Sequence, residues 1–182
     1  MIETKYINRR RLVYSVEELT VNKIVDWTKP VAVIGDGESR CKYIFNRERV
    51  TAFAINRAAR IYPADFMVTW EGHFSIMDAI TEIYIPIVII KKTDSINVIP
   101  YRSATALIFT SYLAQKLKGG TIILQGFNFS NKPTAWGMAM QKKGFYGCKQ
   151  FCDKNGIDLF LTHKNKILDF IPVRKPKSEL YL

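Results

Sequence analysis

Six short apolar segments, separated by polar or amphipathic stretches, constrain the fold of this sequence most. Each has the length of a strand, and most are rich in β-branched or aromatic residues. They are VAVIG from Val31, TAFAIN from Thr51, DFMVTW from Asp65, YIPIVII from Tyr84, TIILQG from Thr121 and IDLFLT from Ile157. Several are apolar on both faces, which is typical of strands buried between two layers. We therefore expect a mostly parallel sheet of about six strands.

Amphipathic stretches lie between these segments. The clearest covers residues 103–118, where Ser103 is placed to cap the start and Gly119-Gly120 follows the end. Its apolar positions repeat at helical spacing: Ala106, Phe109, Leu113 and Leu117. Further helices are expected over residues 16–27, 74–82 and 145–155. Strands alternating with helices predict an α/β domain of doubly wound type, in which ligands bind beyond the carboxyl ends of the strands.

A chain of 182 residues fits one domain. We expect a basic arm and helix over residues 1–30, the α/β domain over residues 31–172, and a tail over residues 173–182 that lies on the surface or is mobile. No apolar stretch is long enough to span a membrane, and the N-terminus lacks the apolar run of a secretory signal. A cytoplasmic location is the default expectation.

Three cysteines, an odd number, argue against a disulfide framework and for reduced thiols. Cys148 and Cys152 are four residues apart and can share a helix face. With no further His or Cys pair beside them, helix packing is favoured over a zinc site. We therefore expect no metal ligand set.

The charge balance points to an anionic partner. The chain has 27 Lys and Arg against 16 Asp and Glu, a net charge of +11, with a pI near 9.6. Such a surplus favours a nucleotide, a nucleic acid or an acidic membrane surface. Part of it lies near the N-terminus, beside Tyr6 and Tyr14, at Lys5, Arg9, Arg10 and Arg11.

The first strand runs into Gly35, Asp36, Gly37, Glu38 and Ser39. Two glycines separated by one residue allow a tight turn and let backbone N–H groups approach an anion. The third glycine of a dinucleotide fingerprint and the Lys of a P-loop are absent. Two interpretations of this segment therefore remain: a phosphate-binding loop, and an ordinary turn between a strand and a helix.

Polar residues also follow the next two strands. Asn56 and Arg57 end the second, and Glu71 and His73 follow the third. Residues at successive strand ends converge on one rim of a parallel sheet. His73 has the ordinary pKa of a general base, although a surface or capping histidine is the alternative.

The fifth strand runs into Gly126, Phe127, Asn128 and Phe129. An amide between two aromatic residues suits contact with a base or sugar, and a tight turn with core phenylalanines explains the segment equally well. His163 follows the sixth strand and can reach the same rim; a surface loop position is its alternative.

Taken in order, these pieces resemble a family of small Rossmann-like proteins. The matching pieces are VAVIGDGES, FAINRAA, YPADFMVTWEG, SATALIFTSYLAQKLKGGTIILQGFNFS and NGIDLFLTHKNKILDFIP, which span most of residues 31–172. The family includes bacterial sialyltransferases that use CMP-sialic acid and a domain-of-unknown-function group related to archaeal 6-hydroxymethylpterin diphosphokinase. The resemblance implies a single three-layer Rossmann-like domain.

The resemblance also implies roles for individual residues. Gly35, Gly37 and Ser39 would form the nucleotide phosphate loop, Asn56 would contact the nucleotide, and Ser103 would bind phosphate or ribose. Residues 126–129 would hold the base or sugar. Glu38 replaces the family's proline and Asn128 its usual aspartate, so Glu38 either points away from the phosphate or meets it through a divalent cation.

Three functions are open at this point. The first is a nucleotide-dependent, glycosyltransferase-like enzyme with a nucleotide-sugar donor, for example of CMP type, in which Arg57 stabilises the leaving nucleotide and His73 or His163 deprotonates the acceptor. The second is an ATP-dependent diphosphokinase that needs Mg²⁺, with Glu71 and Asp65 as ligands. The third is a non-catalytic, basic nucleic-acid-binding protein. An acidic acceptor and a homo-oligomer that completes the acceptor site are further expectations.

Overall fold

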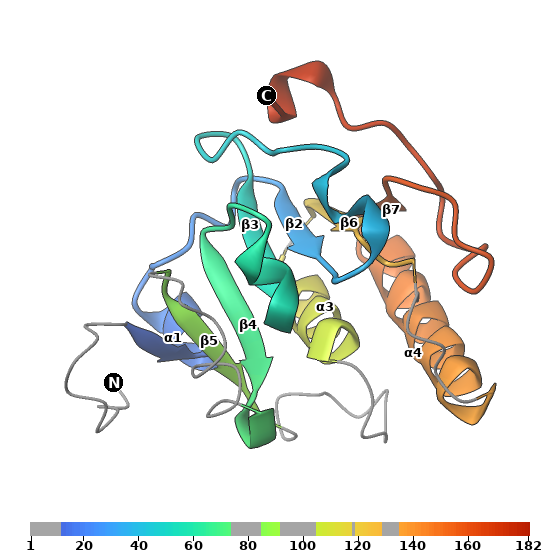
Figure 1. The fold of residues 1–182 in the computed structure, drawn as a ribbon, viewed down its shortest axis with the longest axis horizontal. Coiled ribbons are helices and arrows are strands. Elements are labelled where there is room, and N and C mark those ends of the chain that lie inside the picture. Colours follow the sequence, from blue (N-terminus) through green and yellow to red (C-terminus); the bar gives the residue numbers. More distant parts are fainter. Residues whose placement is uncertain (1–11, 74–84, 92–104, 118, 129–134) are drawn as a thin grey trace.

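The computed structural model describes residues 12–73, 85–91, 105–117, 119–128 and 135–182 (Figure 1). Its centre is a seven-stranded, all-parallel sheet with the order β1-β5-β4-β3-β2-β6-β7. The strands are β1 Val13–Ser15, β2 Val31–Ile34, β3 Thr51–Ile55, β4 Phe66–Trp70, β5 Ile87–Ile90, β6 Thr121–Gln125 and β7 Asp158–Leu161. This confirms the predicted α/β domain and its parallel sheet. Each of the six apolar segments contains a strand, and β1 is the seventh.

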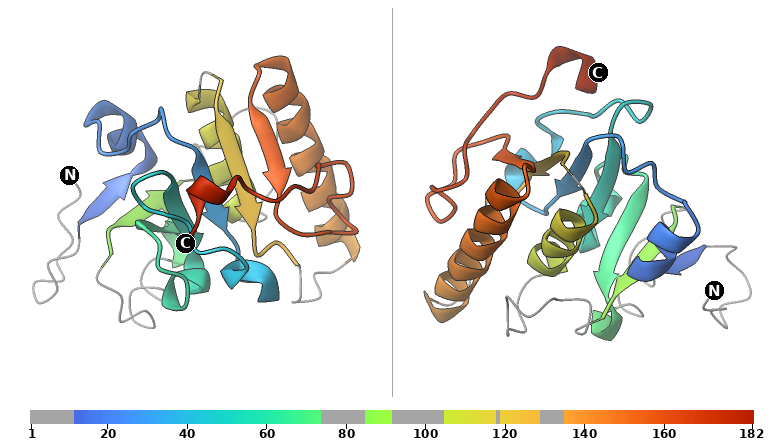
Figure 2. Two further views of the ribbon diagram at one scale, coloured as in Figure 1. Left: turned by 90° about the horizontal axis from the view of Figure 1, so that it is seen from above. Right: turned by 180° about the vertical axis from the view of Figure 1, so that it is seen from behind.

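The helices cover one face of the sheet. They are α1 Val16–Val21, α3 Thr105–Lys116 and α4 Ala135–Lys154. Alternate strand residues such as Val31 and Val33 pack beneath them, together with Phe109 and Phe145 of the helices. The right-hand view of Figure 2 shows α3 and α4 side by side in front of the sheet. The sheet is apolar here because parallel strands are buried on both faces.

Short 3₁₀ helices and the C-terminal tail cover the opposite face (Figure 2). They are η1 Glu38–Cys41, η2 Asn56–Arg60 and, in the tail, η5 Ser178–Leu180; η3 Glu71–His73 follows β4. The sheet residues on this face include the small side chains Ala32, Ala52 and Ala54. Small side chains let these turns approach the sheet closely, so the second layer needs no long helix.

Two helix boundaries differ from the sequence expectations. α1 ends at Val21 instead of residue 27, since Asn22 caps it and Lys23 takes a left-handed φ of 51°. α4 begins at Ala135, ten residues before the expected start, and ends within one residue of the expected end. Ser103 and the helix expected over residues 74–82 lie outside the described residues. The four-residue spacing of Cys148 and Cys152 places both thiols in the core beneath α4, so helix packing is confirmed.

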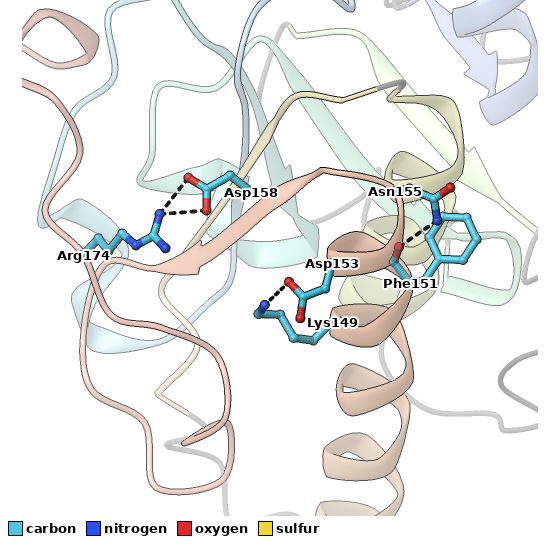
Figure 3. Close-up of polar contacts among 6 residues, drawn as sticks. All are labelled: Lys149, Phe151, Asp153, Asn155, Asp158 and Arg174. Atoms are coloured by element: carbon cyan, nitrogen blue, oxygen red, sulfur yellow. Dashed lines mark hydrogen bonds and ion pairs between the residues drawn. The ribbon is translucent and has the colours of Figure 1, made fainter.

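The tail after Pro172 runs along the molecule in contact with β7 and with the loop that carries Ile44. Val173 forms a parallel bridge with Leu161, and Arg174 donates to both carboxylate oxygens of Asp158 at 2.8 and 2.9 Å (Figure 3). Further on, the N–H of Leu182 donates to the Ile44 carbonyl at 2.8 Å. The tail lies on the surface and ends beside the loop that follows β2.

Figure 3 also shows how α4 turns into β7. The Asn155 side chain donates to the Phe151 carbonyl at 2.8 Å, and Lys149 pairs with Asp153 one helical turn away. The Asn155 side chain thus satisfies a carbonyl of the last turn before Gly156 reverses the chain with a φ of 67°. In the described residues, no helix is long and apolar enough to cross a membrane.

Candidate functional site

The order of the strands reverses between β2 and β6. From β2 the chain continues outward through β3, β4 and β5, and then returns to add β6 on the other side of β2. In open parallel sheets, ligands bind at such a switch point, beyond the carboxyl ends of the strands. The loops after β2 and β6 carry the predicted phosphate loop and the predicted base-binding segment, so the fold brings both to this point.

The two loops meet backbone against backbone. The N–H of Gly35 donates to the Gln125 carbonyl and that of Gly37 to the Gly126 carbonyl, each at 2.7 Å. A Cβ at Gly37 would lie 2.5 Å from the Gly126 oxygen, and a Cβ at Gly126 would overlap the carbonyl of Gly35. The contact between the loops therefore requires these glycines whether or not an anion binds.

Asn128 already uses the donors of Ser39. Its Oδ1 accepts from the Ser39 backbone N–H at 2.9 Å and from the Ser39 hydroxyl at 2.6 Å. These two groups are the ones that the resemblance assigns to a nucleotide phosphate. Asp36 and Glu38 are exposed, so Glu38 does not need a cation to lie beside the loop.

Gln125 is a site residue that the sequence reasoning missed. Its fully buried amide donates to the carbonyls of Arg40 and Tyr43 at 2.6 and 2.8 Å and accepts from the Tyr43 N–H at 3.2 Å. It holds the segment after η1 against the end of β6. The sequence shows Gln125 as a polar residue at the end of a strand, and this was the available sign of its role. Its burial, however, depends on contacts with residues that are 82–85 positions away along the chain.

The aromatic part of the predicted base-binding segment belongs to the core. Phe127 is buried and packs edge-on against Phe145, with ring centroids 5.8 Å apart. Its ring is therefore not available for stacking on a base, and the core alternative is correct for this residue. Phe129 lies outside the described residues.

Asn56 and Thr69 form a different feature, at the adjacent ends of β3 and β4. Ile55 pairs with Val68, so these residues occupy the next positions along the paired strands. Asn56 has a left-handed φ of 49°, a conformation that Asn tolerates better than most residues. Its Oδ1 is buried without a hydrogen-bond partner in the described residues, and the same holds for Oγ1 of the fully buried Thr69.

Unpaired buried polar atoms are rare in proteins, because burying one without a hydrogen bond costs about 1–3 kcal/mol. Two of them at neighbouring strand ends make this place a candidate ligand site. The sequence predicted a ligand role for Asn56, but not for Thr69. Inside a strand, a β-branched threonine fits the pleated sheet whether or not its hydroxyl is used.

The same end of the sheet carries the remaining candidates. Arg57 follows Asn56 and is exposed, and η3 places Glu71 and His73 directly after β4. Glu71 is exposed; for His73 the structure describes the backbone position alone. Trp70, which ends β4, is 37% exposed, and a Cβ at Gly72 would lie 2.7 Å from its ring.

His163 lies on the other side of the switch point, just past β7. It is buried, which contradicts the surface position considered for it; the Phe127 carbonyl lies near the ring, but neither ring nitrogen has a partner in good hydrogen-bond geometry in the described part of the chain. Burial lowers the pKa of His163; the Phe127 carbonyl opposes this shift and the Lys42 ammonium adds to it. β7 is four strand spacings from β4, about 19 Å, so His73 and His163 belong to different parts of the edge.

The two carboxylates expected to bind Mg²⁺ lie at opposite ends of β4. Asp65 precedes the strand, where it accepts from the Ala52 N–H at 2.8 Å and pairs with Arg47 at 2.6 Å. Glu71 follows the strand, about 20 Å away at 3.3 Å per residue. This pair is therefore wrong as a metal site. In the described residues, no group of three His, Cys, Asp or Glu side chains is placed to hold a metal ion.

Comparisons of the chain with protein-family models, with curated proteins and with solved structures gave no match. The chemistry of the carboxyl edge is therefore inferred from its residues. The edge offers buried hydrogen-bonding groups at Asn56 and Thr69, an exposed cation at Arg57 and an exposed carboxylate at Glu71.

Proposed function

We propose that this protein is a nucleotide-dependent, glycosyltransferase-like enzyme whose nucleotide-sugar donor binds at the carboxyl ends of β3 and β4. The observation that carries the proposal is the pair of unpartnered buried atoms, Asn56 Oδ1 and Thr69 Oγ1, at an edge of the sheet where parallel α/β folds bind ligands. The resemblance of the ordered motifs to nucleotide-sugar transferases supports the same class.

The chemistry of these groups fits a nucleoside. Asn56 Oδ1 accepts a hydrogen bond from a base amino group or a ribose hydroxyl, and the Thr69 hydroxyl both donates and accepts. The exposed part of Trp70 at the end of β4 offers an aromatic surface at the same edge. Arg57 follows Asn56 and supplies a positive charge for the phosphate.

In the transfer step, an acceptor hydroxyl attacks the anomeric carbon of the donor sugar. The new C–O bond forms as the bond to the phosphate oxygen breaks, and the nucleotide leaves with the electron pair. Arg57 stabilises the charge on the leaving phosphate, and Glu71 or His73 takes the proton of the hydroxyl. Both proton acceptors belong to η3, next to the proposed donor site, whereas His163 lies beyond the switch point.

Nucleotide binding by calorimetry tests the proposal. We expect CMP-type nucleotides to bind without Mg²⁺, which would exclude the diphosphokinase, and Asn56→Gly to abolish binding. Glycine keeps the left-handed backbone and removes only the amide, so this variant should remain folded. Asn155→Ala, at the end of α4 on the opposite edge of the sheet, is the control and should bind as the wild type does.

Thr69→Val is a second variant, which should change stability and nucleotide affinity in opposite directions. It replaces an unpartnered buried hydroxyl by a methyl group, so it should raise the free energy of unfolding by about 1 kcal/mol and weaken nucleotide binding. The proposal fails if no nucleotide binds, or if Asn56→Gly and Thr69→Val leave the affinity unchanged. Salt-sensitive binding of DNA or RNA without nucleotide binding would favour the nucleic-acid alternative.

A further inference from the structure

A second group of unpartnered buried atoms lies at the carboxyl end of β7. Thr162 is 1% exposed and His163 is 8% exposed; Thr162 Oγ1 and both ring nitrogens of His163 lack hydrogen-bond partners in the described residues. Lys42, from the segment after η1, donates its ammonium to the Thr162 carbonyl at 2.7 Å. Two segments that are distant in sequence therefore place an ammonium beside the strand end that carries a hydroxyl and an imidazole.

The side chains of this group are suited to bind a ligand that accepts hydrogen bonds. The ammonium, the hydroxyl and one imidazole nitrogen are hydrogen-bond donors. In the described residues, no carboxylate forms an ion pair with Lys42 or His163. Lys164 and Lys166 follow on the same loop and are exposed, so the surroundings are positively charged as well.

We propose that Lys42, Thr162 and His163 bind an oxyanion, the phosphate or carboxylate group of a small molecule. An oxyanion offers several acceptor lone pairs on one small group, so it can accept from the Thr162 hydroxyl and the His163 ring, which lack partners in the described residues, and its charge balances that of Lys42. Lys42 is exposed, so its ammonium can leave the Thr162 carbonyl and take the anion in from solvent. β7 and β3 are three strand spacings apart, about 14 Å, so this site is separate from the proposed nucleotide site and does not depend on it.

Histidine NMR tests the proposal directly, because the chain has only two histidines. The His163 resonance is assigned with His163→Gln. Inorganic phosphate and acetate are then titrated in separate arms at constant ionic strength, which distinguishes the two oxyanions. We expect one of them to shift the His163 resonance in a saturable way and to raise the pKa of His163, since a bound anion stabilises the imidazolium.

Lys42→Met and Lys164→Met form the matched pair of variants. Both remove one lysine charge, but only Lys42 touches Thr162. Lys42→Met should weaken anion binding about tenfold, the effect of one charge-assisted hydrogen bond, while Lys164→Met should bind normally. Thr162→Val, which removes only the hydroxyl, should also weaken binding.

The proposal is overturned if neither anion shifts the His163 resonance, or if Lys42→Met and Lys164→Met respond alike, which would mean general screening of a basic protein. Asn56→Gly separates the two proposed sites. Anion binding that persists in this variant supports an independent oxyanion site, whereas its loss contradicts the separation of the two sites. Loss of nucleotide binding alone bears only on the proposed function.

Discussion

At the scale of single residues, two kinds of constraint meet at the carboxyl edge of the sheet. Gly35, Gly37 and Gly126 are required by the close contact of two loops, whereas Asn56 and Thr69 have buried polar atoms that no described residue satisfies. The packing of the two loops explains the glycines. The buried atoms of Asn56 and Thr69 lack hydrogen bonds that a ligand can supply, so the ends of β3 and β4 are a better candidate for the binding site than the glycine loop.

The requirement for glycine at position 126 can be separated from its backbone conformation. Gly126 and Gly156 have similar left-handed φ values of 76° and 67°, but a Cβ has open space at Gly156 and overlaps the Gly35 carbonyl at Gly126. Gly156→Ala should lower the free energy of unfolding by about 1–2 kcal/mol, the left-handed penalty alone. Gly126→Ala should cost clearly more, measured by urea denaturation. Equal losses would mean that the two loops separate easily.

Tyr62 gives the fold a dependence on alkaline pH. Its buried hydroxyl accepts from the Phe45 N–H at 2.9 Å, and burial raises the pKa of Tyr62 to about 12. The folded state thus favours the neutral phenol, whose contribution is complete below pH 10 and is lost as the pH rises from 10 to 12. Tyr62→Phe should cost about 1–3 kcal/mol at pH 8, because the Phe45 N–H loses its acceptor.

The difference between wild type and Tyr62→Phe should therefore narrow above pH 10. Urea denaturation of both proteins at pH 8, 10 and 11 measures this difference. A gap that stays constant over this range would show that Tyr62 ionises as easily in the folded state as in the unfolded chain.

At the scale of elements, the sequence predicts what the apolar pattern controls. Each of the six apolar segments contains a strand, because buried parallel strands need continuous apolar residues. β1 has only three residues, too few for a pattern. The first half of α4 contains Gly137 and Gly144, which have poor helix propensity, so its true start at Ala135 depends on tertiary packing.

The candidate site is less predictable, for a physical reason. Asn56 could be found because a polar residue directly after an apolar strand is visible in the sequence. The burial of Gln125, Thr69 and His163 results from segments far away in the chain. Whether a buried atom has a partner depends on those segments, and no local pattern encodes it.

The three thiols report on the packing of α4. Cys41 is exposed, whereas Cys148 and Cys152 are buried beneath the helix; their mutual hydrogen bond and burial raise the pKa of Cys152. The thiolate is the reactive form, so one thiol should react rapidly with a thiol reagent in the native protein and three in urea. Cys41→Ser should remove the rapid reaction. Rapid reaction of two or three native thiols would contradict the packing of α4.

At the scale of the whole molecule, the net charge of +11 is larger than the two proposed sites need. Both proposed sites need few cations: Arg57 at the nucleotide site and Lys42 at the oxyanion site. Several other basic side chains form surface ion pairs, such as Arg47 with Asp65 and Arg174 with Asp158. The remaining surplus is available for attraction of anions over a distance, which falls with salt, while the sites select among them.

The C-terminal tail completes the second face of the sheet, and its contribution to stability can be tested by truncation. The Tyr181 ring lies 4.8 Å from that of Tyr43, and the Asn46 N–H donates to the Leu180 carbonyl at 2.9 Å. Tyr43 belongs to the segment that Gln125 holds and that also carries Lys42. Removal of residues 178–182 should therefore lower the free energy of unfolding by about 2–3 kcal/mol, from lost apolar burial, and loosen this segment.

Tyr181→Ala should reproduce most of that loss, and hydrogen exchange should show faster exchange at residues 40–46 in both variants. If the tail is instead mobile in solution, its own amides exchange at the rate of an unfolded chain and neither variant changes the stability. In that case the segment that carries Lys42 is held by its contacts with Gln125, Tyr62 and Thr162, and anion binding at β7 should survive the truncation unchanged.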